Sequence, residues 1–437
     1  MDLSAVAFLV IVFATLLMGI WVGLALLVSA ALVVVLFTNI PIGPLMAQYT
    51  MNILTTPDLV ALPLFIIMGE FLFRTRLSER LFSGLAPWAG LMPGRLIHVN
   101  VIASTIFASI SGSSAATTQV VGRMSLTELL RRGYGRGISV GSLAGAGTLG
   151  LLIPPSSIMI IYGVLAQESV LRLFAAGVFP GLLLATLFVL YIVVCAIIKP
   201  GIVPESERKL SAMPLRQRLA ATIHLLPVLG LVVVVMGSMY AGLATPTEAA
   251  AFGVLGAALV AKLDGTLTWK SLREVAHGSV QTCSMMGLIL VGATILSFAT
   301  TILGYPQALN NWVATMDLSP LMLIAVMLVV YLLLGTFMDG FSMIVTTLPI
   351  FLPLAVAAGF DPIWFGIFII VTVEMSNVTP PVGFNLFVIQ GLTGRDLFDI
   401  ARATMPYFFL MVVMVMILAA FPEIALWLPR TMFAAAS

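Results

Sequence analysis

Long apolar segments alternate with short polar ones along the whole chain, and this pattern sets the class of the protein. Twelve segments are apolar over most of their length, at residues 3–18, 22–38, 58–73, 97–118, 138–166, 173–198, 221–240, 246–262, 279–303, 320–356, 362–392 and 403–428. A helix of about 20 apolar residues spans a membrane. Lipid offers the backbone no hydrogen-bond partners, so such segments are expected to be helical. The pattern predicts an all-α, multi-pass membrane protein with about 10–11 transmembrane helices.

Basic residues between the apolar segments give their orientation. Lys and Arg gather at residues 74–95, 123–136, 199–218, 262–273 and 395–402. Such excess is typical of the cytoplasmic side of a membrane. Segment 97–118 has a basic loop at both ends, so it should enter and leave on one side as a re-entrant hairpin. Its middle is rich in Ser, Thr and Gly, which suits a hairpin tip enclosed by protein.

The second half of the chain shows the same arrangement from the opposite side. No Lys or Arg lies between Arg273 and Arg395. Segment 279–303 leaves the cytoplasm and segment 362–392 returns to it, so segment 320–356 must begin and end outside. We therefore expect a second re-entrant hairpin, entering from the opposite face, and an inverted relation between the two halves.

A Pro-Pro pair follows the hairpin tip in each half. Forty-two residues separate Gly112 from Pro154, and 40 separate Gly340 from Pro380. Proline removes a backbone donor and clashes with the preceding turn, so each pair should interrupt its helix. One such interruption would be a packing feature. Two of them, each paired with a polar hairpin in inverted halves, indicate the binding site of a secondary transporter.

Broken helices at membrane depth have a definite chemistry. They free backbone carbonyl oxygens, which together with Ser and Thr hydroxyls suit a hard cation such as Na⁺. Half-helix N-termini carry partial positive charge and can face an anion. The sequence therefore predicts an ion-coupled transporter of organic anions and not an enzyme.

Composition and charge agree with a membrane transporter and argue against binding of nucleic acid or nucleotides. Of the 437 residues, 61% are hydrophobic and 9% are charged, against about 25% charged in a soluble domain. The net charge is only +2, and the sequence has no run of basic residues suited to binding nucleic acid. Residues 145–150 match G-x-G-x-x-G, but no strand is expected before them and Pro154 soon follows. A nucleotide site is therefore not expected there. An ATP-driven pump is not expected either, because the sequence has no Walker A motif.

Two other functions compete with transport. A channel also uses re-entrant segments, but the inverted pair of broken helices favours alternating access. An intramembrane aspartyl protease would use Asp339 with a second acid within reach of one water, and Glu374 is the only deep candidate. Acids at membrane depth are functional candidates by default, so both are candidate coupling acids.

Several motifs resemble one known family over essentially the whole chain. The large membrane subunit of a tripartite ATP-independent periplasmic (TRAP) transporter is similar at residues 111–117, 150–156, 245–250, 335–343 and 378–383. Residues 245–248, Thr-Pro-Thr-Glu, are also typical of a helix start with a capping box.

The resemblance implies an elevator mechanism driven by Na⁺ in a bacterial inner membrane. It implies two protein partners, a small membrane subunit (Q subunit) and a periplasmic substrate-binding protein (P subunit). The substrate would be an organic acid such as a C4-dicarboxylate, sialic acid or a related carboxylate. Under the resemblance the chain divides into scaffold helices (1–95), a first transport half (96–172), scaffold helices with a cytoplasmic linker at 199–218 (173–278), a second transport half (279–402) and a C-terminal helix (403–437).

The resemblance also implies sites, carried over position by position. The first sodium site would use Ser111, Ser113, Ser114, Gly150, Ile153 and Pro155. The second would use Gly335, Ser376, Thr379 and Val382. The substrate would lie between the hairpin tips, near Ser114, Thr117, Gly340, Ser342, Thr346 and Asn385.

Overall fold

The computed structural model describes residues 3–208, 213–316, 318–336, 338–380 and 383–433, and these residues form helices and loops without strands. The predicted all-α membrane fold is therefore confirmed. Six helices of the described part are long and apolar enough to cross a membrane, or eight if each of two bent pairs is one span. The sequence predicted 10–11 spans, which is more than this count. Several of the predicted apolar segments are shorter apolar helices that build the hairpins and broken segments, and these are too short to be counted as spans.

The first part of the chain runs from the N-terminus to the first hairpin. Its helices are α1 (Leu3–Leu17), α2 (Val22–Phe37), α3 (Ile42–Leu54), the short turn η1 (Pro57–Val60), α4 (Ala61–Phe73) and α5 (Leu77–Ala89). Helices α3 and α5 lie outside the apolar segments predicted from the sequence. Both helices carry polar residues, and this lowers their hydropathy below that of a membrane span.

The first predicted hairpin and its Pro-Pro break are both present. The segment contains α6 (Ile97–Ser111), α7 (Ser114–Arg131), α8 (Arg136–Gly147), α9 (Leu149–Leu152) and α10 (Ser157–Ala166). The chain reverses at Gly112, whose φ of 57° lies in the left-handed region that favours glycine. The axis bends by 40° between Arg136–Leu152 and Ser157–Ala166, because Pro154 and Pro155 cannot continue a helix.

The middle of the chain connects the two halves. It consists of α11 (Val170–Ile198), η2 (Pro200–Ile202), α12 (Glu205–Arg208), α13 (Leu215–Thr222), η3 (Ile223–Leu225), α14 (Leu226–Val232), the π-helical turn η4 (Val233–Gly237), α15 (Ser238–Tyr240) and α16 (Pro246–Leu263). The predicted capping box at the start of α16 is confirmed, since Thr245 accepts from Glu248 N and the Glu248 side chain accepts from Thr245 N.

The second half repeats the hairpin and the break. Its helices are α17 (Trp269–Ile302), α18 (Tyr305–Ala314), α19 (Pro320–Leu334), α20 (Gly340–Ala357), α21 (Pro362–Ser376), α22 (Phe384–Thr393), α23 (Leu397–Ala420) and α24 (Glu423–Phe433). The hairpin is α19 and α20, joined across its interior by a 2.8 Å hydrogen bond between the hydroxyls of Tyr331 and Thr347. The break lies between α21 and α22.

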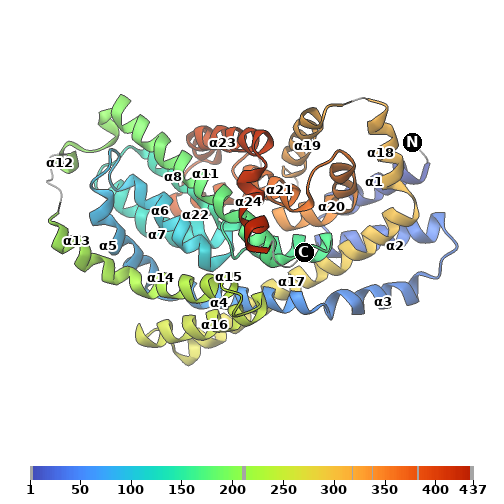
Figure 1. Ribbon diagram of the computed structural model, residues 1–437, viewed down its shortest axis with the longest axis horizontal. Coiled ribbons are helices and arrows are strands. Elements are labelled where there is room, and N and C mark those ends of the chain that lie inside the picture. The colour runs from blue at the N-terminus through green and yellow to red at the C-terminus, as the bar shows by residue number, and fades with distance from the viewer. Residues whose placement is uncertain (1–2, 209–212, 317, 337, 381–382, 434–437) are drawn as a thin grey trace.

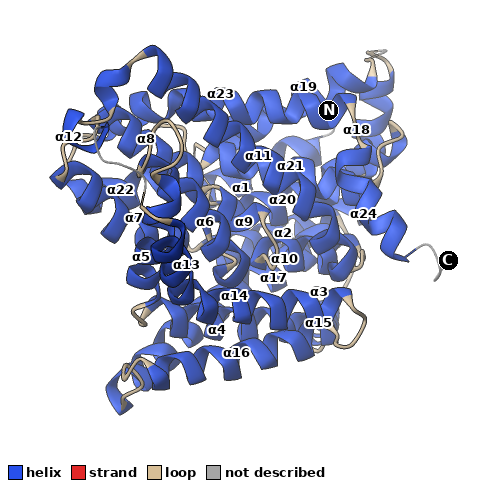
Figure 2. Ribbon diagram, turned by 60° about the vertical axis from the view of Figure 1, so that its left-hand side comes forward, coloured by secondary structure: helices blue, strands red, loops and turns tan. Residues whose placement is uncertain are grey.

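The helices form two groups that are visible in both views (Figures 1 and 2). One group contains α3, α4, α14, α15, α16 and α17, along the lower side of each picture. In this group α4 packs on α16, and α17 packs on α2, α3 and α4. The other group holds the hairpins and broken helices. Long α11 packs there on α6, α9, α21, α23 and α24.

The linker lies against the base of the first hairpin. Gly135 N donates to Ile202 O at 2.8 Å, and Arg132 forms an ion pair with Glu207 at 2.9 Å. Glu128 on α7 pairs with the same Arg132 at 2.7 Å. The described parts of residues 199–218 therefore contact the turn between α7 and α8.

Candidate functional site

The tip of the first hairpin packs directly on the first helix break. A Cβ atom at Gly150 would lie 2.6 Å from both the Ser113 carbonyl oxygen and Ser114 Cα, so only glycine permits this approach. On the other side, the Ser157 hydroxyl donates to Gly112 O at 2.8 Å. A Cβ at Gly112 would meet the Pro155 carbonyl oxygen at 2.9 Å. Residues predicted for the first sodium site are thus brought together from the tip and from the break.

Side-chain and backbone oxygens are concentrated at this junction. Ser111 and Thr117 hydroxyls lie 2.9 Å apart across the tip, and Ser113 caps α7 by accepting from Ala116 N. Ser156, next to Pro155, is fully buried, and its hydroxyl has no hydrogen-bond partner among the described residues. An orphaned buried hydroxyl is unfavourable unless something else binds it, so the oxygen set fits a cation such as Na⁺.

The second hairpin meets the second break in a matching way. A Cβ at Gly335 would collide with the Ser376 side chain. Thr379 donates its hydroxyl to Ser376 O at 3.0 Å. A Cβ at Gly383 would meet the carbonyl oxygens of Asn377 and Thr379, each at 2.9 Å, so carbonyl groups converge on this turn. Three of the four residues predicted for the second sodium site lie at this junction, and the fourth, Val382, lies outside the described residues.

Asp339 is located at the tip of the second hairpin, where it caps α20. Its carboxylate accepts from Phe341 N at 3.1 Å and Ser342 N at 3.4 Å, and also contacts the Ser342 hydroxyl. The residue is exposed. A carboxylate at a helix N-terminus is favoured by the free N–H groups there. The geometry therefore gives Asp339 a structural task that the sequence analysis did not assign.

Glu374 is in a very different environment, because its side chain is fully buried. It lies on α21 and accepts hydrogen bonds from Ser114 Oγ at 3.0 Å, Asn377 Nδ2 at 3.2 Å and Leu151 N at 3.2 Å. Asn385 on α22 reaches the same serine, with Nδ2 2.8 Å from Ser114 Oγ. Glu374 thus connects the first hairpin and first break to the second broken segment.

The residues predicted to bind substrate fall into two groups. Ser114, Thr117 and Asn385 are buried together beside the first hairpin tip. Ser342 and Thr346 belong to α20, where Thr346 donates its hydroxyl to Ser342 O at 2.7 Å. Gly340 stands at the start of the same helix, and a Cβ there would strike Val373 on α21.

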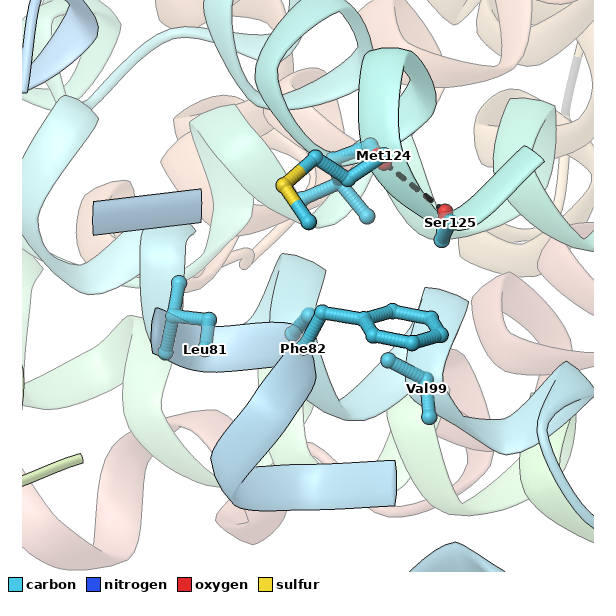
Figure 3. Close-up of a pocket in the computed structure, with 7 residues that line it drawn as sticks. Leu81, Phe82, Val99, Met124 and Ser125 are labelled. Atoms are coloured by element: carbon cyan, nitrogen blue, oxygen red, sulfur yellow. Dashed lines mark hydrogen bonds between the residues drawn. The ribbon is translucent and has the colours of Figure 1, made fainter. Parts of the chain in front are cut away.

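A cavity between α5 and the first hairpin is too small for an organic acid (Figure 3). Its volume is about 10 Å³, which is roughly the space of one water molecule. Its lining is mostly apolar and consists of Leu81, Phe82, Val99, Ala103, Val121, Met124 and Ser125.

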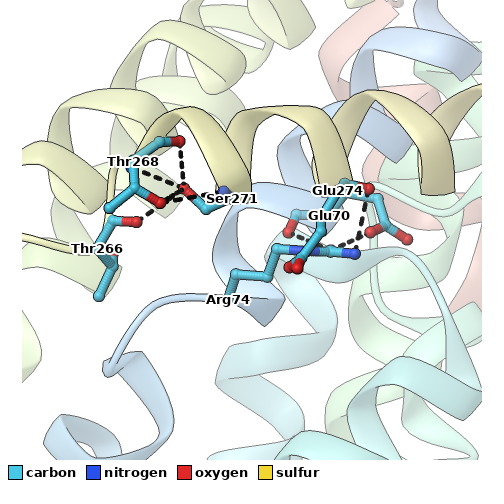
Figure 4. A network of polar contacts seen from close by, with 6 residues as sticks. All are labelled: Glu70, Arg74, Thr266, Thr268, Ser271 and Glu274. Carbon is cyan, nitrogen blue, oxygen red and sulfur yellow. Dashed lines mark hydrogen bonds and ion pairs between the residues drawn. The ribbon is translucent and has the colours of Figure 1, made fainter.

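A charged cluster joins α4 to α17 on the side predicted to be cytoplasmic (Figure 4). Arg74 pairs with Glu70 one turn earlier and lies 3.6 Å from the Glu274 carboxylate; it also contacts the Glu274 carbonyl oxygen at 3.3 Å. An open hollow of about 480 Å³ lies beside it. Because Arg74 is shared by two carboxylates, the cluster fastens two helices that already pack on each other.

Sequence reasoning missed two features of the site. Ser156 follows Pro155 directly, so the sequence could have placed it in the break. That its hydroxyl lacks a hydrogen-bond partner among the described residues could not be predicted from the sequence. The carbonyl of Gly147 was also missed. It accepts from Ser114 Oγ at 2.9 Å, and it lies in a glycine-rich run that offered no local signal.

Comparison with known proteins supports the fold and identifies the family. The C4-dicarboxylate TRAP transporter large permease protein DctM of Pseudomonas aeruginosa is 36% identical over 380 residues, covering 85% of this chain and 86% of that protein. The sialic acid TRAP transporter large permease protein SiaM of Vibrio cholerae is 29% identical over 414 residues, covering 94% and 95%.

A solved structure has the same fold at low sequence identity. The YdaH transporter of Alcanivorax borkumensis, described as having an unusual topology, superimposes with a TM-score of 0.60 at 14% identity, covering 94% of this chain and 98% of that chain. Residues 9–424 match the family model described as the tripartite ATP-independent periplasmic transporter, DctM component. The chain therefore belongs to this family of multi-pass membrane transporters, as a large permease subunit.

Proposed function

We propose that this chain takes up an organic acid by coupling it to Na⁺, across a bacterial inner membrane. The observation that carries the proposal is the matched pair of close approaches, Gly150 against the Ser113–Ser114 backbone and Gly335 against Ser376. Each brings a hairpin tip and a broken helix into contact, so two oxygen-lined sites can form and open as the hairpins move. The relatives named for C4-dicarboxylate and sialic acid support a carboxylate substrate.

Two partners belong to the proposal. The family is tripartite by description, and we infer a periplasmic substrate-binding protein that delivers the acid and a small membrane subunit.

The movement we propose is an elevator motion of one helix group against the other. In that proposal α11 moves with the hairpins, because it packs on α6, α9 and α21. Helix α17 stays with the fixed group, because it packs mainly on α2, α3 and α4. The domain boundaries expected from the resemblance would then move. Helix α11, which was expected to be scaffold from residue 173, would join the moving group, and the part of α17 after residue 279 would join the fixed group.

Sodium titration of the purified protein tests the two sites separately. Ser113→Ala removes a hydroxyl from the first site, and Thr379→Ala removes one from the second. We expect each variant to weaken the sodium-dependent change in intrinsic Trp fluorescence, while Thr127→Ala, at an exposed threonine on α7, leaves it intact. Equal sodium responses in the unmodified protein and all three variants would refute the assignment of these sites.

A further inference from the structure

Helix α17 is longer than the membrane is thick, so part of it extends beyond the hydrocarbon core. It has 34 residues, from Trp269 to Ile302, which is a length of about 51 Å, against a core of about 30 Å. Trp269 is 82% exposed, and Lys270 follows it directly. Trp and Lys are typical of the interface between lipid and water on the cytoplasmic side. The first turns of α17 therefore lie at the level of the lipid headgroups.

Three polar residues continue along one side of α17 after Trp269. Arg273, His277 and Gln281 follow at intervals of four residues, so their side chains lie one above another and form a ridge on the helix surface. All three are exposed, and none forms a hydrogen bond or ion pair with another described residue. Polar side chains that face hydrocarbon without partners are unfavourable. This α17 ridge is therefore expected to meet a polar ligand.

The α17 ridge borders the open hollow of about 480 Å³ beside the charged cluster of α4 and α17. Arg74, Glu274 and Gly278 complete the lining. A Cβ atom at Gly278 would lie 2.7 Å from the Glu70 carboxylate, so this glycine lets α17 approach α4 closely below the hollow. The volume is in the range of about 300–1,000 Å³ that is usual for small-molecule sites. The hollow can therefore hold a ligand of the size of a lipid headgroup.

The charges around the hollow favour an anion. Arg74 is shared by the two nearby acids, since it pairs with Glu70 and lies 3.6 Å from the Glu274 carboxylate (Figure 4). Lys270 and Arg273 are the other two basic side chains on this part of α17, and neither has an ion pair among the described residues. Three basic groups thus stand against two acids, and Arg273 is free to bind a ligand. The planar guanidinium of arginine matches the oxygens of a phosphate.

The order of side chains along α17 matches the order of chemical groups in a phospholipid. Arg273 is nearest the interface, where the phosphate of a lipid lies. His277 and Gln281 follow one and two turns deeper and carry N–H donors, which suit the ester carbonyl oxygens of the glycerol unit. Val280 and Met285 are 64% and 50% exposed, so they offer apolar surface to the acyl chains at the same depth or deeper.

We propose that the hollow between α4 and α17 binds an anionic phospholipid of the cytoplasmic leaflet, with its phosphate on Arg273 and its glycerol esters at His277 and Gln281. Basic pockets between membrane helices on the cytoplasmic side suit such headgroups, and that leaflet carries anionic lipid. Helices α4 and α17 pack on each other in the group that we propose to stay fixed. The lipid therefore helps to anchor this group in the bilayer, and it shares no residue with the proposed sodium and substrate sites.

Retention of radiolabelled phosphatidylglycerol by the purified protein in detergent tests the site. We expect the unmodified protein to retain phosphatidylglycerol in preference to phosphatidylcholine, whose headgroup has no net charge. Arg273→Gln should weaken this retention about tenfold, because charge-assisted hydrogen bonds to the phosphate are lost. Arg216→Gln is the matched control and should retain the lipid normally, because Arg216 is an exposed arginine on α13 that has no ion pair among the described residues.

A variant that should gain binding keeps the proposal testable if Arg273→Gln does not fold. Glu274→Gln removes a negative charge from the lining, so it should strengthen the retention of phosphatidylglycerol. Equal retention of the two lipids by the unmodified protein, or unchanged retention in folded Arg273→Gln or Glu274→Gln, would overturn the lipid site. Loss of the lipid on addition of inorganic phosphate would also overturn it and would indicate a site for free anions. The measurement involves no transport, so its failure would leave sodium-coupled uptake untouched.

Discussion

Replacing Gly150 with alanine is the sharpest perturbation of the first proposed sodium site. The new Cβ would stand 2.6 Å from the Ser113 carbonyl oxygen and from Ser114 Cα, both of them backbone atoms. Ordinary contact begins at 3.4 Å, so the hairpin tip must retreat by about 0.8 Å. The ligands contributed by the hairpin and by the break would then no longer meet at one ion.

The magnitude follows from the cost of overpacking. Inserting a methyl group into a tightly packed interior costs about 1–3 kcal/mol. If the strain is confined to the closed, sodium-bound conformation, it lowers sodium affinity by about 5–150-fold. If the strain is spread over all conformations, the protein becomes less stable and the affinity changes less.

The assay is sodium-dependent uptake into proteoliposomes that contain this chain with its small subunit and binding protein. The sodium concentration at half-saturation should rise for Gly150→Ala. Gly137→Ala is the matched control, because it lies in α8 and its new Cβ would meet nothing within 4 Å. A Gly150→Ala protein with unchanged sodium dependence and unchanged stability would refute the close approach as part of the site.

Three further results are expected. Gly335→Ala should impair sodium-dependent uptake through the second site, whereas Gly391→Ala, with open space around it, should not; equal uptake by the two variants would count against that site. Arg132→Ala should make the linker around Glu207 more susceptible to limited proteolysis, because the Arg132–Glu207 ion pair is lost. Hydrogen bonds from Arg131 and Arg132 lower the pKa of Glu128. The contact between Glu128 and Arg132, which holds Arg132 beside Glu207 of the linker, is therefore fully present above the ordinary carboxyl pKa and weakens as pH falls through the lowered value. Linker cleavage that is independent of pH would contradict this. Withdrawal of Na⁺ should speed amide exchange at the first hairpin tip, measured by mass spectrometry, and identical exchange would contradict sodium binding there.

Local chemistry made the two hairpins and the two breaks predictable. Gly112 adopts a φ of 57° at the first reversal, a conformation that most other residues avoid. Pro154 and Pro155 stop a helix because of their own covalent structure. Features of this kind depend on a few adjacent residues, so they can be recognised without knowledge of what surrounds them.

The partners of Glu374 were not predictable in the same way. Ser114 is 260 residues away in the sequence, and the contact exists only because a hairpin tip and a broken helix from the other half meet. In the sequence, Asp339 and Glu374 are equivalent as acids within apolar segments. The structure separates them, since Asp339 is an exposed helix cap and Glu374 is fully enclosed.

Amphipathic helices were the main omission in the fold. Helix α5 contains Glu79 and Arg80, and α3 contains Gln48 and Asn52. A search for continuous apolar segments passes over such helices, because their apolar residues are confined to one side.

The central claim is that Na⁺ drives uptake of an organic acid through this chain. The most direct measurement is accumulation of a labelled C4-dicarboxylate or sialic acid in proteoliposomes, with the small subunit and the cognate binding protein present and an inward sodium gradient imposed. We predict accumulation that requires both the gradient and the binding protein and that collapses when the gradient is dissipated. Downhill flux that needs neither would contradict the account and indicate a channel.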